Sequence, residues 1–139
     1  MRQYQQTLTL NTRGQGLSEF TLDVVQIVSD AEIEVGLAHI FCRHTSASLL
    51  IQENADPDVQ RDLIAFFKRL VPDGDPHFVH RSEGADDMPA HVKSALTQTT
   101  LTIPIANGRL MLGTWQGIYL FEHRAHPHDR HVIVHVIGD

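Results

Sequence analysis

Apolar residues recur at every second position in several stretches of the chain, which is the period of a β-strand with one buried face. Phe20, Leu22 and Val24 alternate with polar neighbours, and this pattern predicts a strand at that point. A longer strand is predicted over 33–41, where both faces become apolar, as in a strand at the centre of a sheet. This central strand would carry His44 at its far end.

A helical pattern begins after Asp56, where Asp followed by Pro57 is typical of an N-cap and a proline at the first helical position. Apolar residues then recur at helical spacing, which predicts a helix over 58–70. Leu63 and Phe66 lie on its apolar face, so we expect both side chains in the core.

The last third of the chain is predicted to be mainly β. Residues 101–105 and 110–112 flank an Asn-Gly pair at 107–108, the strongest hairpin pattern in the sequence. Two further strands are predicted over 118–123 and 132–137. Because strands come in runs and do not alternate with helices, we predict an α+β fold with packed mixed or antiparallel sheets and two main helices.

Length and composition indicate a single domain over 1–139 and exclude several classes of partner. The formal charge is −6 and the basic residues are scattered, so we expect no nucleic-acid binding. No apolar run approaches the roughly 20 residues of a membrane span, and no membrane partner is expected. The lone Cys42 cannot form an internal disulfide, which favours a reduced, cytoplasmic protein.

Polar, ligand-capable side chains gather in three segments, at 44–58, 80–91 and 113–124. The first follows the predicted central strand, the second leads into a predicted helix, and the third surrounds a predicted strand. Their similar chemistry predicts one composite site for a polar small molecule, and Arg81 and Arg124 are available there to bind a phosphate of that molecule.

The second segment contains His80 and His91 on either side of several acids. A second helix is predicted to begin near Asp87, with Pro89 in its first turn, so that His91 lies near the helix start. Imidazole nitrogens suit Zn²⁺, whereas a carboxylate-rich set favours Mg²⁺, so a divalent metal of either kind is expected.

The third segment ends with an acid and an imidazole in adjacent positions. Glu122 shares a face with Ile118 and Leu120, and a Glu on an apolar face must be paired, protonated or functional. Adjacent strand residues point to opposite faces, so only one of Glu122 and His123 should enter a given cavity. Both remain candidates, Glu122 as an acid and His123 as a third metal ligand.

Other polar residues complete the predicted site. The catalytic candidates are Glu122, Asp87 and His44, the metal candidates are His80, His91 and His123, and the substrate-binding candidates are Ser46, Asn54, Arg81, Trp115, Gln116 and Arg124. The alternative for the hydroxyl groups is that they satisfy backbone groups, and for the arginines that they pair with surface acids.

The three polar segments together resemble the YjbQ family, also called UPF0047, and the resemblance runs from about residue 5 to residue 136. It implies a homotrimer with an α+β fold. It also implies a weak thiamine-phosphate synthase activity, in which a pyrimidine pyrophosphate joins a thiazole phosphate with loss of pyrophosphate. Two alternatives stay open: a non-catalytic trimer that binds a metal or a small metabolite, and a metal-dependent hydrolase.

Overall fold

The computed structural model describes all residues of the chain, Met1–Asp139. Its larger sheet has five antiparallel strands, in the order β1 (Arg2–Asn11), β8 (Asp129–Gly138), β3 (Val35–Cys42), β5 (Thr100–Ala106) and β6 (Arg109–Leu110). The predicted central strand is therefore confirmed as β3. The predicted hairpin is β5 and β6, and Asn107 and Gly108 at its turn have φ angles of 53° and 70°, the left-handed conformation that a type I′ turn requires.

The smaller sheet has three antiparallel strands, in the order β2 (Gly16–Glu19), β7 (Gln116–Glu122) and β4 (Ala47–Glu53). The sequence pattern did not separate β4 from the strand before it. In the structure the chain leaves the larger sheet at Cys42, crosses through residues 43–46, and enters the smaller sheet at Ala47. Segment 43–46 therefore connects the two sheets.

Three helices complete the fold, α1 (Thr21–Ala31), α2 (Pro57–Leu70) and α3 (Asp87–Leu96). The α+β class with packed antiparallel sheets is confirmed, but the prediction of two main helices is one helix short. None of the three has the length and apolar character needed to span a bilayer.

Helix α1 replaces the strand that was predicted around Phe20, and that prediction is wrong. Leu22, which should have alternated inward, is 81% exposed. The buried positions of α1 include Val24, Ile27 and Val28, spaced three and four residues apart as on one face of a helix. The apparent alternation covered too few residues to distinguish the two-residue period of a strand from the 3.6-residue period of a helix.

Helix α2 begins as predicted but packs differently. The carboxylate of Asp56 accepts a hydrogen bond from the N–H of Asp58 at 2.9 Å, and Pro57 is the first helical residue. The expectation that Phe66 lies in the core is wrong, since its side chain is 49% exposed, and Leu63 is only partly buried. No residue of α2 is fully buried, so the helix packs loosely against the rest of the chain.

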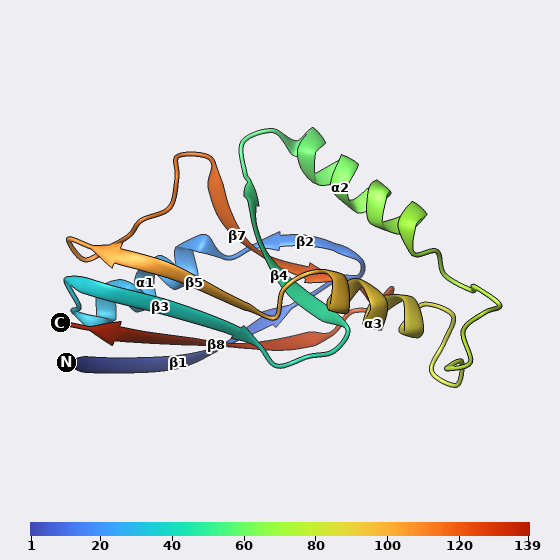
Figure 1. The fold of residues 1–139 in the computed structure, drawn as a ribbon, viewed down its shortest axis with the longest axis horizontal. Coiled ribbons are helices and arrows are strands. Elements are labelled where there is room, and N and C mark those ends of the chain that lie inside the picture. Colours follow the sequence, from blue (N-terminus) through green and yellow to red (C-terminus); the bar gives the residue numbers. More distant parts are fainter.

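The hydrophobic core lies between the inner face of the larger sheet and two other layers (Figure 1). Ile40 and Val134 point inward from the larger sheet, Val24 from α1, and Leu49 and Leu120 from the smaller sheet. Helix α3 contacts β4 close to the point where the chain crosses between the sheets. The ends of β3, β4, β7 and α3 therefore meet in one region.

Candidate functional site

Three side chains that are chemically able to ligate a metal come together at the start of α3. Nε2 of His80 lies 2.7 Å from Oδ2 of Asp87, and Nε2 of His91 lies 3.1 Å from the same oxygen. One ligand atom from each residue lies within 4.8 Å of the others. Asp87 and His91 are four residues apart on α3, so one helix face presents both, while His80 approaches from the loop before the helix.

The tautomer of His91 favours a cation at this point. Its Nδ1–H donates to the carbonyl oxygen of Thr45 at 2.8 Å, because a carbonyl oxygen can only accept. In a neutral His91 the lone pair of Nε2 therefore faces the carboxylate of Asp87. Two acceptors at this distance repel unless a proton or a metal ion lies between them. Metal-binding histidines commonly have their second nitrogen held by a carbonyl or a carboxylate in this way.

The carboxylate of Asp87 is ionised and held in place. Its side chain is 2% exposed, and its other oxygen, Oδ1, accepts a hydrogen bond from Nη1 of Arg124 at 2.8 Å. Burial acts to raise the pKa of Asp87, but the hydrogen bond from His80 and the charges of His91 and Arg124 keep it below its ordinary value. An ionised carboxylate with one oxygen directed at two imidazoles can ligate a divalent metal.

Arg124 orients Asp87 and has little capacity left to bind a phosphate. Its Nε donates to Asp86 at 2.9 Å and its Nη2 donates to the carbonyl oxygen of Glu83, in addition to the bond to Asp87. Arg124 was predicted to bind substrate. In the structure it instead holds the carboxylate of Asp87 in position for His80 and His91.

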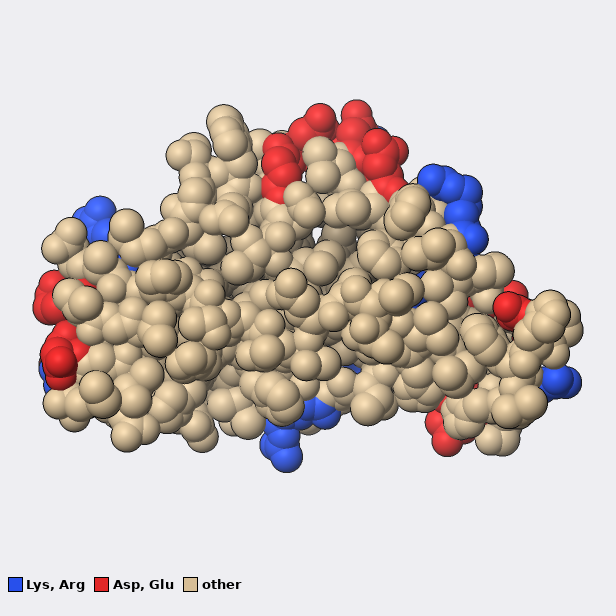
Figure 2. Space-filling model, viewed as in Figure 1, with Lys and Arg blue, Asp and Glu red and all other residues tan.

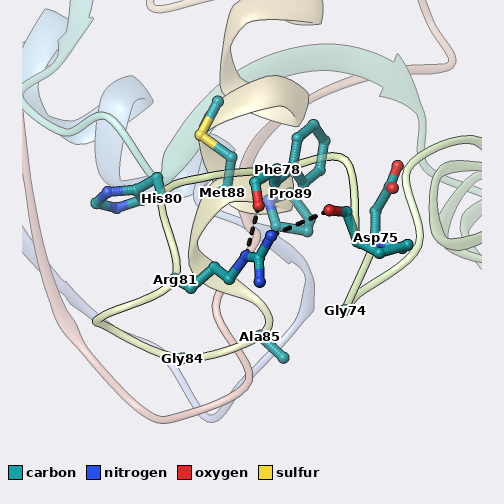
Figure 3. A pocket seen from close by; sticks show the side chains of 10 residues that line it. Gly74, Asp75, Phe78, His80, Arg81, Gly84, Ala85, Met88 and Pro89 are labelled. Atoms are coloured by element: carbon teal, nitrogen blue, oxygen red, sulfur yellow. Dashed lines mark hydrogen bonds between the residues drawn. The ribbon is translucent and has the colours of Figure 1, made fainter.

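A cavity of about 320 Å³ opens beside His80. Arg81 lies across it and donates hydrogen bonds to the carbonyl oxygens of Phe78 and Pro76, at 2.7 and 3.1 Å, as the dashed lines in Figure 3 show. Its Nη1 makes no bond within the chain. Arg81 is thus the predicted phosphate-binding residue that retains a free donor.

His44 lies on the other side of His91. Both line a second, open cavity of about 480 Å³. Nε2 of His44 accepts a hydrogen bond from the N–H of His131 at 2.7 Å. Burial and the charge of Arg130 lower the pKa of His44, so its imidazole is neutral near pH 7. The structure brings His44 to the same region as His91 but not into the metal-ligand group.

Glu122 forms a buried ion pair. Arg130 binds both of its carboxylate oxygens, and the bond from Nε to Oε1 measures 2.8 Å. Thr12 donates to Oε1 at 2.7 Å, and the backbone N–H groups of His123 and Arg124 donate to Oε2. Burial acts to raise the pKa of Glu122, but the bonds from Arg130 and Thr12 outweigh it and hold the pKa below its ordinary value. Every oxygen is occupied, which favours a structural role over the predicted catalytic one.

The hydroxyl of Ser46 belongs to the same network. It accepts a hydrogen bond from Nη2 of Arg130 at 2.9 Å, as does the carbonyl oxygen of Ser46 at 3.2 Å. This contact ties the crossing segment to β8 and occupies the hydroxyl of Ser46.

His123 is separate from His80 and His91. Its side chain is 1% exposed, Nε2 is hydrogen-bonded to the hydroxyl of Ser48 at 2.8 Å, and Nδ1 has no partner. Burial, with smaller contributions from Lys93, lowers the pKa of His123 to about 3. The predicted third imidazole of the metal site therefore lies in another buried environment.

Three more predicted residues lie at the opposite end of the smaller sheet. Gln116 pairs with Glu53 in the register of β4 and β7, whereas the region near His91 is at the end where Ala47 pairs with Glu122. Asn54 donates to Glu19, and Trp115 is 63% exposed. A strand of this length spans roughly 20 Å, so the structure divides the predicted composite site into two places.

Sequence reasoning missed Arg130, although its position offered a sign. Arg130 precedes Val132 and Val134 at the same strand spacing, and so falls on a buried face. A basic residue on one apolar face and Glu122 on another suggest a buried pair. Lys93 was also missed: it is 3% exposed, and burial lowers the pKa of its ammonium group.

The fold and the site define an α+β protein with two antiparallel sheets, three helices and a histidine–aspartate group at the start of one helix. The family model described as UPF0047 protein YjbQ-like matches residues 6–139. The chain belongs to this family.

Relatives and solved structures agree with the assignment. The UPF0047 protein sll1880 of Synechocystis is 54% identical over 99% of this chain and 94% of its own length, and YjbQ of Escherichia coli is 44% identical over 98% and 99%. A crystal structure of a YjbQ/UPF0047 protein from Clostridium acetobutylicum is 39% identical, with a TM-score of 0.85, over 94% of this chain and 98% of that one. A Sulfolobus solfataricus structure, described as of unknown function, has a TM-score of 0.91 at 24% identity over 99% of both chains, which shows a shared fold.

The ion pair between Glu122 and Arg130 can be tested by removing its charge. Glu122→Gln should lower the free energy of unfolding by about 3–5 kcal/mol, because the guanidinium of Arg130 stays buried without an anion. Urea denaturation at pH 7 measures this. The control is Glu32→Gln, which removes an exposed pair with Arg2 and should cost under about 1 kcal/mol. Equal, small effects of the two substitutions would contradict the structural role of Glu122.

His123 should make the protein less stable on mild acidification. Its pKa is about 3 in the folded chain and ordinarily 6.5, so between these values the unfolded chain binds a proton that the folded chain does not. The free energy of unfolding should therefore fall as the pH drops, by about 1.4 kcal/mol per pH unit between pH 6 and 5. Urea denaturation across this range measures the slope, and His123→Asn should reduce it by that amount. An unchanged slope in the variant would assign the pH dependence to other groups.

Proposed function

We propose that His80, Asp87 and His91 bind one divalent metal ion, and that the protein uses it to act on a phosphate-bearing small molecule. One observation carries the proposal: Nε2 of each histidine is directed at the same oxygen of a buried carboxylate, with Nδ1 of His91 already used by Thr45.

Zn²⁺ fits the ligand set better than Mg²⁺. Two imidazole nitrogens and one carboxylate oxygen are ligands that Zn²⁺ prefers, whereas Mg²⁺ takes mainly oxygen ligands. Three protein ligands leave a coordination position for water or substrate, as in catalytic zinc sites. Asp87 holds its orientation through Arg124, which is the kind of support that tunes metal affinity.

The specific reaction that we propose is the thiamine-phosphate synthase reaction that the family resemblance implies. A C–N bond forms between the thiazole nitrogen and the pyrimidine methylene carbon, while the C–O bond to pyrophosphate breaks and pyrophosphate leaves. A bound divalent metal would supply positive charge to the leaving pyrophosphate.

The protein residues contribute binding and orientation to this reaction. Arg81 offers its free Nη1 to a phosphate from within the cavity beside His80, and Phe78, Met88 and Pro89 supply apolar surface for a ring. His44 lies in the second cavity as a neutral imidazole whose Nε2 is held by the N–H of His131, so it offers its ring to a bound molecule as a wall of the cavity. Because the two cavities adjoin His80 and His91 respectively, two reactants can approach the metal ligands from different sides.

Two other functions use the same residues and are separated by experiment. A non-catalytic binding protein would hold the metal without turnover. A metal-dependent hydrolase would release phosphate from a single pyrophosphate-bearing substrate without a second reactant. Assays of metal-loaded protein with the pyrimidine pyrophosphate alone, and then with the thiazole phosphate added, distinguish the three.

As part of this proposal we place the protein in the cytoplasm, since the thiol of Cys42 is buried and unpaired.

Metal binding should depend on the three ligands and not on nearby histidines. Asp87→Asn and His91→Ala should each weaken zinc affinity at least about tenfold, whereas His77→Ala should leave it unchanged, because the imidazole of His77 is 91% exposed and binds Asp75. Competition titration with a zinc chelator measures the affinity. Binding should also weaken on acidification, since a ligating imidazole must be unprotonated. Wild-type affinity in the Asp87→Asn and His91→Ala variants would refute the site.

The outer face of the larger sheet supports the proposal of a homotrimer. Phe41 is 49% exposed and Leu37 38%, and Ile133 and Ile137 lie beside them on β8 with only partial burial. No helix covers this side of the strands. Figure 2 shows charged side chains gathered mainly toward the rim of the view, with few over its centre. This nearly uncharged face carries its four apolar side chains among polar ones such as His39 and His135, and it is suited to contact with other copies of the chain.

Assembly through this face can be tested by introducing one negative charge into it. We expect light scattering at micromolar concentration to give three times the 15.6 kDa of one chain. Phe41→Asp should lower the mass to that of a monomer, since it would bury an unpaired carboxylate in the interface. Phe66→Asp introduces the same charge at a similarly exposed position on α2 and should leave the trimer intact. A wild-type monomer would exclude the trimer, and a trimer that persists in Phe41→Asp would exclude this face.

A further inference from the structure

Two histidines lie in the middle of the outer face of the larger sheet. His39 of β3 and His135 of β8 stand directly opposite each other in the strand register, and both side chains are partly buried. The neighbouring rows on the two sides are apolar, and they consist of Leu37 with Ile137 and of Phe41 with Ile133. A row of two imidazoles therefore divides the apolar surface that we propose as the contact between chains.

Within one chain, the partners of these imidazoles can satisfy either protonation state. Nδ1 of His135 lies 2.9 Å from the amide oxygen of Gln5, and Nε2 lies 3.1 Å from that of Gln3. Nδ1 of His39 lies 3.1 Å from the hydroxyl oxygen of Thr102. A side-chain amide presents its oxygen or, after a half turn, its NH₂ group, and a hydroxyl can donate or accept. A single chain can therefore take up a proton on either ring without loss of a hydrogen bond.

No carboxylate lies near enough to balance a positive charge on either ring. The neighbours on β1 and β5 are uncharged, and beneath the strands lies the apolar core. The register places the charged or titratable groups of this face at the strand ends, four or more residues from the row, which is roughly 13 Å. They are Arg43, Asp129 and His131 at one end, and at the other Arg109, Asp139 and the Met1 ammonium group that is paired with Asp139.

Copies that meet through this face bring the same rows of side chains. The neighbouring chain therefore adds apolar and uncharged polar groups to the middle of the contact, and no acid. While the face is in water, the solvent stabilises a charged ring. Once the face is covered, an unpaired charge there is costly.

We propose that His39 and His135 make the assembly of the chain dependent on pH, so that the chains join while both rings are neutral and separate when the rings gain protons. Protonation favours the separate chains, in which the rings remain in contact with water. Association should therefore weaken as the pH falls through the range from about 8 to 5, in which histidine side chains change charge. The switch rests on the proposed trimer through this face and is independent of the proposed metal centre.

Light scattering and sedimentation of the metal-free protein at micromolar concentration test the switch. The wild-type mass should be that of three chains at about pH 7.5 and should fall at about pH 5.5, with an association constant at least about tenfold lower. His39→Gln combined with His135→Gln leaves no titrating group in the row, so this double variant should keep its association constant. Circular dichroism at each pH shows whether the chain stays folded, because His123 also destabilises the fold on acidification.

Two single substitutions complete the test. His77→Gln removes an imidazole that is 91% exposed and distant from the sheet face, and this control should dissociate on acidification as the wild type does. His39→Lys places a lasting positive charge in the row and should separate the chains already at about pH 7.5. This second readout does not require the double variant to fold.

The outcomes separate the switch from the trimer. A wild-type protein that is monomeric at about pH 7.5 would refute both. A trimer with the same association constant at both pH values, a double variant that dissociates as the wild type does, or a His39→Lys protein that stays trimeric would each overturn the switch and leave the trimer in place.

Discussion

The ion pair between Arg130 and Glu122 joins the two sheets, and the geometry of the region around the candidate site depends on it. Arg130 comes from β8 in the larger sheet and Glu122 from β7 in the smaller sheet, and both side chains are at most 5% exposed. Neither charge is tolerable in the interior alone, so each requires the other. Ser46 and Thr12 satisfy the remaining bonding capacity of the pair, and thereby anchor the crossing segment and the end of β1 to it.

This network leads by direct contact to the proposed metal ligands. The carboxylate of Glu122 accepts a hydrogen bond from the backbone N–H of Arg124. This bond fixes the backbone position from which the Arg124 side chain extends. Arg124 in turn binds Asp87, whose free oxygen faces His80 and His91. The structural ion pair and the proposed metal ligands are therefore two ends of one hydrogen-bonded chain. A side chain that first suggested catalysis, Glu122, has its effect on the site through this support.

The sequence predicted an element correctly where the pattern that defines the element lies within a few neighbouring residues. The cap at Asp56 and Pro57, the Asn-Gly turn at 107–108 and the central strand β3 all follow from neighbouring residues, and the structure has each of them. The same kind of reasoning failed for α1, because three alternating residues fit two periods and the contacts of Val24 with the core decide between them. It also failed for Phe66, since helical spacing shows which face is apolar but not how closely that face is covered.

For the candidate site, the sequence alone determined the chemical types and the family, because these depend on which side chains are present and in what order. It named His80 and His91 as metal candidates and Asp87 as a catalytic candidate, and their spacing around a helix start brings the three close. Only the tertiary structure decided that His123 lies elsewhere, that Asn54 and Trp115 lie at the far end of the smaller sheet, and that Arg130 neutralises Glu122. The reason is physical: strand register and the crossing between sheets are set by burial of the whole core, and no local pattern contains that information.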